Sequence, residues 1–245
     1  VVLMKNKMHL CCVSNLQTFT ARIYFFLHFL LASLPQLALA QFEDDFTDGN
    51  FSTGPSWRGN DSLFLVADGQ LLLNGMNQDG VAYMSTPSTL IRPASWEFEI
   101  TYGFNPSSNN YTQVFLVADE PDLTTSLNGY FVMIGNARDE VSLYKQTGSA
   151  ISEIIDGRDD LLNTTTVAIK IKVTHDENGW RLFTAAKSSD SFTLEGASED
   201  DAISTSEYFG IVCHYTATRS DKISFDNFLV KPTSLTEETG PDLKE

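Results

Sequence analysis

The chain has 245 residues and a formal net charge of −16, because 32 acidic residues face 16 basic ones. Such a negative surface repels phosphate backbones, so a nucleic-acid partner is excluded at this stage. The length allows one or two domains, and the residues from Gln41 onward are enough for one large all-β domain.

Residues 1–40 have the pattern of a secretory signal peptide. They carry basic residues but no acidic one, and the apolar run 23–40 ends in an Ala-x-Ala cleavage pattern. An uncleaved N-terminal anchor fits less well, because Pro35 interrupts the run and the run is short for a membrane span. We therefore expect a mature protein that begins at Gln41, is secreted or displayed at the cell surface, and has no membrane span.

From residue 42 onward the chain predicts strands rather than helices. Short runs rich in β-branched and aromatic residues alternate with clusters of Gly, Asn, Asp and Ser. Asp68-Gly69 and Asn178-Gly179 have the composition of hairpin turns. The polar residues 232–245 predict an acidic disordered tail. The predicted strands cover 42–46, 63–67, 70–74, 81–86, 95–104, 112–119, 129–135, 140–146, 150–155, 165–175, 179–187, 207–216 and 222–231.

This series of strands predicts an all-β fold. About a dozen short strands form a two-sheet antiparallel sandwich or a barrel, and the absence of a fixed repeat argues against a propeller. In the runs 95–104 and 165–175, apolar residues alternate with polar ones. Each of these strands should therefore turn one face to a core and the other to water.

The two ends of the predicted domain carry similar patterns. The chain reads QFEDDFTDGNF at 41–51 and KISFDNFLV at 222–230, so each end has two phenylalanines separated by acidic or amide residues. In a closed sandwich the first and last strands often pair, which protects both edges. We expect these two segments to lie side by side, with phenylalanines in the core and the acidic positions outward or at one rim.

Taken together, several segments resemble concanavalin A-like (laminin G-like) jelly-roll domains of secreted Bacteroidota proteins. They are FEDDFTDG, DGQL, WEFEI, NGYFVMIG, KVTHDENGW and FDNFLV, and the resemblance covers essentially all of 42–231. It implies one jelly-roll domain at 41–231 with two antiparallel sheets. It says less about function, because this fold serves lectins, glycan-binding modules, glycosidases and adhesion domains.

The acidic residues of the two terminal segments are candidate calcium ligands. Calcium binds six to eight hard oxygen atoms, and jelly-roll carbohydrate modules commonly hold a structural Ca²⁺ where their terminal strands meet. No EF-hand spacing is present, so these side chains could equally be solvated edge charges or turn formers. The candidate set is Asp44, Asp45, Asp48, Asp226 and Asn227.

Exposed aromatic residues are the candidate glycan-binding groups. A sugar stacks its apolar face on a ring and needs polar partners for its hydroxyls. Tyr111 and Trp57 fall in predicted loops, and Trp180 follows a predicted turn. A large β core also uses many aromatic residues, so packing in the core is the alternative for each of the three.

Catalysis is the less favoured interpretation. Glu97 and Glu99 share a strand face and offer a glycosidase pair, although an ordinary exposed strand face would look the same. In the string 153–156, strand spacing predicts that Glu153 and Asp156 point to opposite faces. Cys213 would be the one cysteine after signal cleavage, and we expect it to be a buried small hydrophobe rather than a nucleophile.

The sequence therefore predicts a secreted, non-catalytic binding domain. The expected partner is a glycan or a cell-surface protein, with Ca²⁺ as the candidate structural ion. Two alternatives stay open: a divergent glycoside hydrolase of the same fold, and a structural spacer within a larger exported protein.

Overall fold

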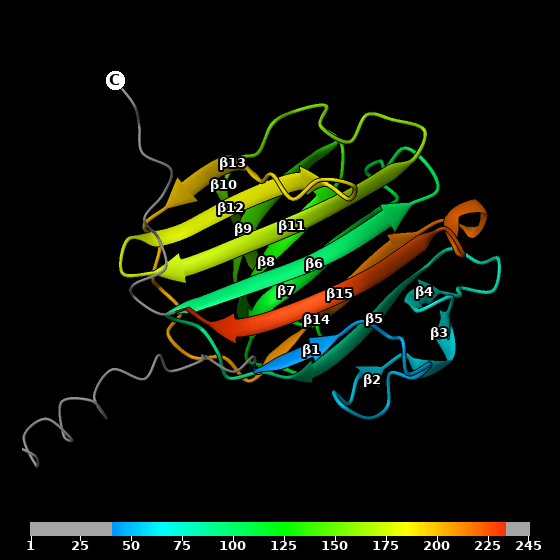
Figure 1. The fold of residues 1–245 in the computed structure, drawn as a ribbon, viewed down its shortest axis with the longest axis horizontal. Helices are drawn as coiled ribbons and strands as arrows, with labels where there is room; N and C mark the ends of the chain where they lie inside the picture. Colours follow the sequence, from blue (N-terminus) through cyan, green and yellow to red (C-terminus); the bar gives the residue numbers. More distant parts are fainter. Residues whose placement is uncertain (1–40, 234–245) are drawn as a thin grey trace, which may run out of the picture. The chain divides into compact units, whose positions relative to one another are not determined.

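The computed structural model describes residues 41–233 as an all-β sandwich of two antiparallel sheets, the fold that the sequence predicts (Figure 1). The predicted signal peptide at 1–40 and residues 234–245 of the predicted tail lie outside the described residues. One sheet has eight strands and the other has seven.

The eight-stranded sheet forms one layer of Figure 1, with the last strand of the chain near its middle. In spatial order it contains β13 (Thr193–Ser198), β12 (Gly179–Ala186), β11 (Val167–Asp176), β6 (Ala94–Tyr102), β15 (Ile223–Pro232), β4 (Gln70–Leu73) and β3 (Phe64–Ala67), with β1 (Phe42–Asp44) paired to β15.

The seven-stranded sheet forms the second layer (Figure 1). In spatial order it contains β10 (Ala150–Ile155), β9 (Glu140–Gly148), β8 (Leu127–Gly135), β7 (Tyr111–Ala118), β14 (Tyr208–Tyr215), β5 (Gly80–Pro87) and β2 (Arg58–Gly59). Two short 3₁₀ turns, η1 (Asp61–Leu63) and η2 (Ala217–Arg219), join strands within the described chain.

The first and last strands pair, as the matching terminal patterns predict. In β1 and β15, Phe42 lies opposite Val230 and Asp44 lies opposite Phe228. Figure 1 shows β1 in blue beside β15 in red. Phe46, Phe225 and Phe228 are almost fully buried. The phenylalanines of both segments therefore close one end of the core.

The core lies between the two sheets and is continuous along them. The predicted alternation of β6 is confirmed: Trp96, Phe98 and Ile100 are buried, and Glu97 and Glu99 stand between them on the opposite face. The same holds for β11, where Ile171 and Val173 are fully buried. Cys213 is also in this core, as predicted.

The two predicted hairpin turns are present. Asp68 and Gly69 connect β3 to β4 with φ angles of +53° and +70°, the left-handed backbone of a two-residue hairpin turn. Gly179 has φ +94° at the β11–β12 turn, where Asp176 pairs with it.

Two strands were not predicted. β2 has only two residues, and β13 has no buried residue, so neither shows a hydrophobic alternation. The predicted tail also begins slightly too early, because β15 extends to Pro232. No helix within 41–233 has the length and hydrophobicity needed to cross a bilayer.

Candidate functional site

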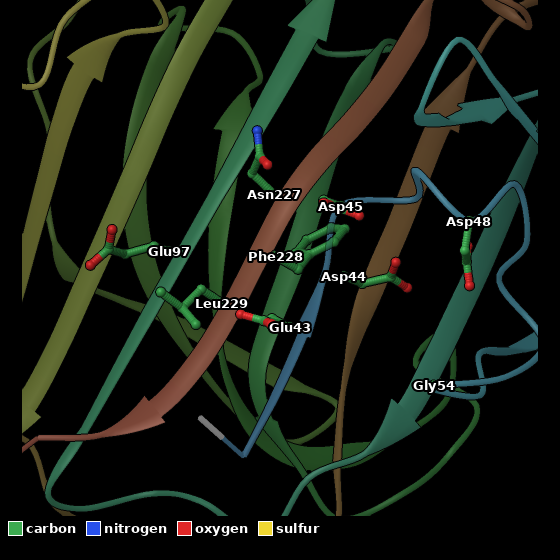
Figure 2. Close-up of a pocket in the computed structure, with 9 residues that line it drawn as sticks. All are labelled: Glu43, Asp44, Asp45, Asp48, Gly54, Glu97, Asn227, Phe228 and Leu229. Carbon is green, nitrogen blue, oxygen red and sulfur yellow. The ribbon is translucent and has the colours of Figure 1, made fainter. Parts of the chain in front are cut away.

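The acidic residues of the terminal segments surround a pocket of about 510 Å³ beside β15. In Figure 2, Glu97 and Asn227 lie on one side of the β15 ribbon, and Asp44 and Asp48 lie on the other. The lining residues are Glu43, Asp44, Asp45, Asp48, Gly54, Glu97, Asn227, Phe228 and Leu229. Four of the five predicted calcium ligands therefore line one pocket, and carboxylates dominate its polar surface.

Asp44 differs from the other acidic residues of this pocket because it is nearly buried, at 9% exposed. One carboxylate oxygen accepts the backbone N–H of Phe46 at 3.0 Å, and the other accepts the indole N–H of Trp57 at 2.8 Å. Burial raises the pKa of Asp44, and these two hydrogen bonds oppose that rise. Of the two predicted placements of the acidic positions, outward or at one rim, Asp44 does not take the outward one: it is nearly buried and fixes the ring of Trp57, and it lines the same pocket as Asp45 and Asp48.

Asp45 and Asp48 are exposed and stabilise local turns. Asp45 accepts the backbone N–H and the hydroxyl of Thr47, and these bonds lower its pKa. Asp48 accepts the backbone N–H of Asn50 at 3.0 Å. Such bonds from a residue to the backbone two positions later are typical of Asx turns.

Asp226 does not line the pocket. Its carboxylate lies 3.6 Å from the Lys187 ammonium and accepts a hydrogen bond from Gln70 at 3.3 Å. Within 41–233, the terminal carboxylates form no group of three whose oxygens lie within 4.8 Å of one another. The terminal set is thus an acidic pocket whose ligand atoms do not converge on one point.

Two of the three predicted glycan-binding residues lie in the core. Trp57 and Trp180 are both 0% exposed. Trp57 packs among four phenylalanine rings, and Trp180 stacks on His175 with ring centres 3.9 Å apart. The alternative of core packing is therefore correct for both residues, since a buried indole offers no face to a sugar. Both buried indole N–H groups have an acceptor. That of Trp57 donates to the Asp44 carboxylate, and that of Trp180 donates to the Asp200 carbonyl.

Tyr111 is half-buried, and it begins β7 instead of lying in a loop. Its ring stacks on that of His214 with the centres 4.3 Å apart and the planes 10° apart. His214 in turn contacts the side-chain amide of Gln113 at 3.4 Å. Burial lowers the pKa of His214 and so favours the neutral imidazole.

A second hydrophobic cluster lies on the outer face of the seven-stranded sheet, the face turned away from the main core. Phe131 and Val212 belong to it, and their neighbours along β8 and β14 belong to the main core. Its buried members are Phe115, Ala118, Leu123, Leu127, Phe131 and Val212, and its half-exposed rim is Tyr83, Met133, Tyr144 and Tyr208.

Strand register places this cluster beside the side-chain amide of Gln113, which lies close to Tyr111. One row of paired residues crosses five strands in the order Tyr83, Val212, Gln113, Met133 and Ser142. Tyr111 and His214 pair in the next row on the same face. We call this surface the outer aromatic face, defined by Tyr83, Tyr111, Gln113, Met133, Tyr144 and His214. This surface was not predicted from the sequence. A strand with apolar residues on both faces has no alternation of apolar and polar residues, so the sequence does not show which of its side chains face outward.

A third group of charged residues lies at the β9–β10 end of that sheet. Arg138 binds Glu140 at 2.9 Å, Glu153 at 2.9 Å and Asp156 at 3.0 Å. The prediction that Glu153 and Asp156 point to opposite faces is wrong, because an irregularity in the β9–β10 register follows Glu153 and brings both carboxylates to one guanidinium. Glu140 is only 3% exposed, and burial raises its pKa to about 7.

The candidate catalytic pair Glu97 and Glu99 is divided between two lysines. Glu97 lies 3.4 Å from Lys172, and Glu99 lies 2.8 Å from Lys187. Each carboxylate is therefore in its own ion pair on the face of the eight-stranded sheet.

Comparison with known proteins finds solved structures with a similar fold. No protein-family model matches the chain, and no curated protein matches it in sequence. Among solved structures, the carbohydrate-binding module CBM66 from Bacillus subtilis is similar with a TM-score of 0.51 and 14% identity, over 71% of this chain and 94% of that one. The exoplasmic/lumenal domain of VIP36, in a form bound to Ca²⁺ and mannose, is similar with a TM-score of 0.57 and 11% identity, over 76% of this chain and 85% of that one. The carbohydrate recognition domain of Emp47p is similar with a TM-score of 0.53 and 13% identity, over 81% of this chain and 98% of that one.

These likenesses confirm a concanavalin A-like jelly-roll sandwich. At identities of 11–14% they establish the fold and carry no residue of a binding site to this chain.

Proposed function

We propose that this domain binds a carbohydrate on its outer aromatic face, without catalysis. The observation that carries the proposal is the second hydrophobic cluster. The outer face of a sheet in a two-layer sandwich normally meets water and is polar. Here it presents half-exposed rings and the half-exposed imidazole of His214, with the Gln113 amide nearly buried among them. Such a surface indicates a ligand.

The chemistry of the outer aromatic face suits a sugar. Tyrosine rings offer flat apolar surfaces for the C–H face of a pyranose. The hydroxyl of Tyr144 already donates to Glu153 at 3.0 Å, so Tyr144 would contribute its ring face. The neutral His214 supplies one donor and one acceptor, and the Gln113 amide, only 9% exposed, contacts that imidazole at 3.4 Å and so holds its ring in place. A strongly charged ligand is less suited to this patch, because none of its six defining residues carries a formal charge at neutral pH.

The similar structures support a glycan as the partner. CBM66 is a carbohydrate-binding module, Emp47p contributes a carbohydrate recognition domain, and VIP36 is bound to mannose. Export of the protein is part of the proposal and is supported by the pattern at 1–40 and by the exoplasmic/lumenal location of the VIP36 domain. The expected origin in Bacteroidota stays a prediction.

Two features of the sequence analysis remain proposals. Tyr111 stays a glycan-binding candidate. The terminal set of Asp44, Asp45, Asp48 and Asn227 stays a candidate for structural Ca²⁺, supported by its shared pocket. Asp44 is the weakest member of that set, because both of its oxygens already accept hydrogen bonds.

Affinity electrophoresis against a panel of soluble polysaccharides tests the proposal. We expect at least one polysaccharide to retard the purified protein without release of reducing sugar. Tyr111→Ala and Tyr144→Ala should each weaken that binding by about twofold to tenfold, the equivalent of about 0.5–1.5 kcal/mol of ring contact. Leu194→Ala is a matched control, since Leu194 is 52% exposed on the other sheet.

Three results would contradict the proposal. Absence of retardation by every polysaccharide would favour a protein partner or a spacer role. Release of reducing sugar would favour the glycoside hydrolase. Equal retardation of the wild type and both tyrosine variants would move the binding site away from the outer aromatic face.

A further inference from the structure

We propose that Glu140, Asp156 and Asp159 form a site for a divalent cation, with Ca²⁺ as the ion that suits it. One carboxylate oxygen from each residue lies within 4.8 Å of the others. The site is distinct from the terminal pocket, and it does not depend on the carbohydrate proposal. It lies where β9 begins and where the chain leaves β10.

An unsatisfied oxygen points to a missing ligand. Glu140 is 97% buried, and its Oε2 atom makes no well-aligned hydrogen bond within residues 41–233, whereas Oε1 binds Arg138 and the Ser142 hydroxyl lies close enough to the carboxyl group to lower its pKa. A buried carboxylate oxygen without a partner is costly, because it has lost its water and gained nothing in exchange. A cation held between Glu140, Asp156 and Asp159 would satisfy it.

The charge of the cluster leaves room for a dication. Among the described residues 41–233, Arg138 is the one cation that binds Glu140, Glu153 and Asp156. Asp159 adds a further carboxylate, and its side chain takes part in none of the hydrogen bonds or ion pairs among residues 41–233. With all four carboxylates ionised, the cluster keeps three negative charges in excess over Arg138. Arg138 is 43% exposed, and an ion at this site would compete with its guanidinium for Glu140 and Asp156.

The backbone holds the site together without the ion. Gly157 packs so closely on β9 that a Cβ atom there would overlap the Val141 carbonyl oxygen. Its N–H donates to the Ser142 hydroxyl at 2.9 Å. Directly after Asp159 the chain is tied to the β8–β9 turn, because the N–H of Asp160 donates to the Arg138 carbonyl and the N–H of Leu162 donates to the Asp139 carbonyl. Asp156 and Asp159 are thus held beside Glu140 on both sides.

The ligand class follows from the donors. Carboxylate oxygens are hard ligands, which Ca²⁺ and Mg²⁺ prefer over the softer metals that choose thiolate or imidazole. Ca²⁺ accepts irregular geometry and completes its shell with water and carbonyl oxygens, so three carboxylates spread over a strand and a loop suit it better than Mg²⁺. The dissociation constant should fall at about 10⁻⁴–10⁻³ M, as in extracellular calcium modules.

Isothermal titration calorimetry of chelator-treated protein with CaCl₂ tests the site. Asp159→Asn removes an exposed carboxylate without disturbing the fold, and Glu140→Gln keeps the size of a buried side chain. Each should weaken calcium binding by about tenfold or more. Asp68→Asn, in the β3–β4 turn, is the matched control and should bind as the wild type does. Urea unfolding of Glu140→Gln should be run alongside to show that this variant is folded.

Arg138→Gln distinguishes a cation site from an ion-pair network. Removal of the competing guanidinium should strengthen calcium binding, and adding Asp159→Asn should remove that gain, because Asp159 is a ligand of the proposed site but not a partner of Arg138. In an ion-pair network without a site, Asp159→Asn would leave the gain unchanged. The proposal is overturned if the wild type shows no saturable heat with CaCl₂, or if Asp159→Asn and Glu140→Gln both bind Ca²⁺ as tightly as the wild type. If Asp45→Asn instead abolishes the heat, the ion binds in the terminal pocket.

Discussion

Trp57 is predicted to stabilise the fold and to play no part in ligand binding. Its ring is fully buried between the two sheets, and the nearest of its four aromatic neighbours, Phe228, lies with its ring centre 5.1 Å away. Its indole N–H donates to the nearly buried Asp44 carboxylate at 2.8 Å. In Trp57→Phe the smaller ring leaves that carboxylate oxygen without its donor and leaves part of the indole volume unfilled.

The expected decrease in the free energy of unfolding follows from the lost hydrogen bond and the unfilled volume. A hydrogen bond to a charged group contributes about 1.5–3 kcal/mol, and an unfilled space the size of a methyl group or more costs about 1 kcal/mol. Trp57→Phe should therefore lower the free energy of unfolding by about 2.5–4 kcal/mol, measured by urea denaturation. Leu194→Ala, at a side chain 52% exposed, should stay within about 0.5 kcal/mol of the wild type. A loss below about 1 kcal/mol for Trp57→Phe, together with weaker polysaccharide binding, would refute this reasoning and restore Trp57 as a ligand contact.

Two further predictions concern buried titratable groups. Burial lowers the pKa of His175 below 6.5, and its Nε2 atom has no hydrogen-bond partner in the described part of the chain, so protonation would place a charge without a hydrogen-bond partner beside Trp180. The unfolded chain therefore protonates His175 at a higher pH than the folded protein does. The stability that neutral His175 contributes is complete above pH 6.5 and declines as the pH falls below it. The fall in urea midpoint between about pH 7.5 and pH 5 should be smaller in His175→Phe than in the wild type, and an equal fall would contradict the assignment. Burial also raises the pKa of Cys213 far above its usual range, so a protein that begins at Gln41 should react with a thiol reagent only after denaturation. Rapid modification of the native protein would show that Cys213 is accessible.

The fold could be predicted from the sequence because local pattern and long-range order agree. Strands such as β6 and β11 alternate clearly between core and water, and Asp68-Gly69 marks its turn by composition. The pairing of β1 with β15 could be inferred from two similar patterns of phenylalanine and acid. β13 could not be found in this way, since it lies at a sheet edge with no buried residue.

The candidate sites were harder to predict, because they depend on which aromatic residues the packing leaves exposed. Trp57 and Trp180 have loop-like or turn-like surroundings in sequence, yet the sheets enclose both. Met133 lies in an apolar run and Tyr144 directly follows the core residue Leu143, so strand register is needed to show that both face away from the core. The charged cluster depends on the register irregularity after Glu153 and on the close approach of Gly157, neither of which has a sequence pattern of its own.

The most direct test of the central claim locates the bound sugar on the protein. A ¹⁵N–¹H correlation spectrum should be recorded while an oligosaccharide from the best-retained polysaccharide is added. We predict shift changes at β5, β7, β8, β9 and β14 around Tyr111, Gln113 and Tyr144, with little change beside β1 and β15. Changes confined to the terminal pocket or to the eight-stranded sheet, or a spectrum that no oligosaccharide alters, would contradict carbohydrate binding on the outer aromatic face.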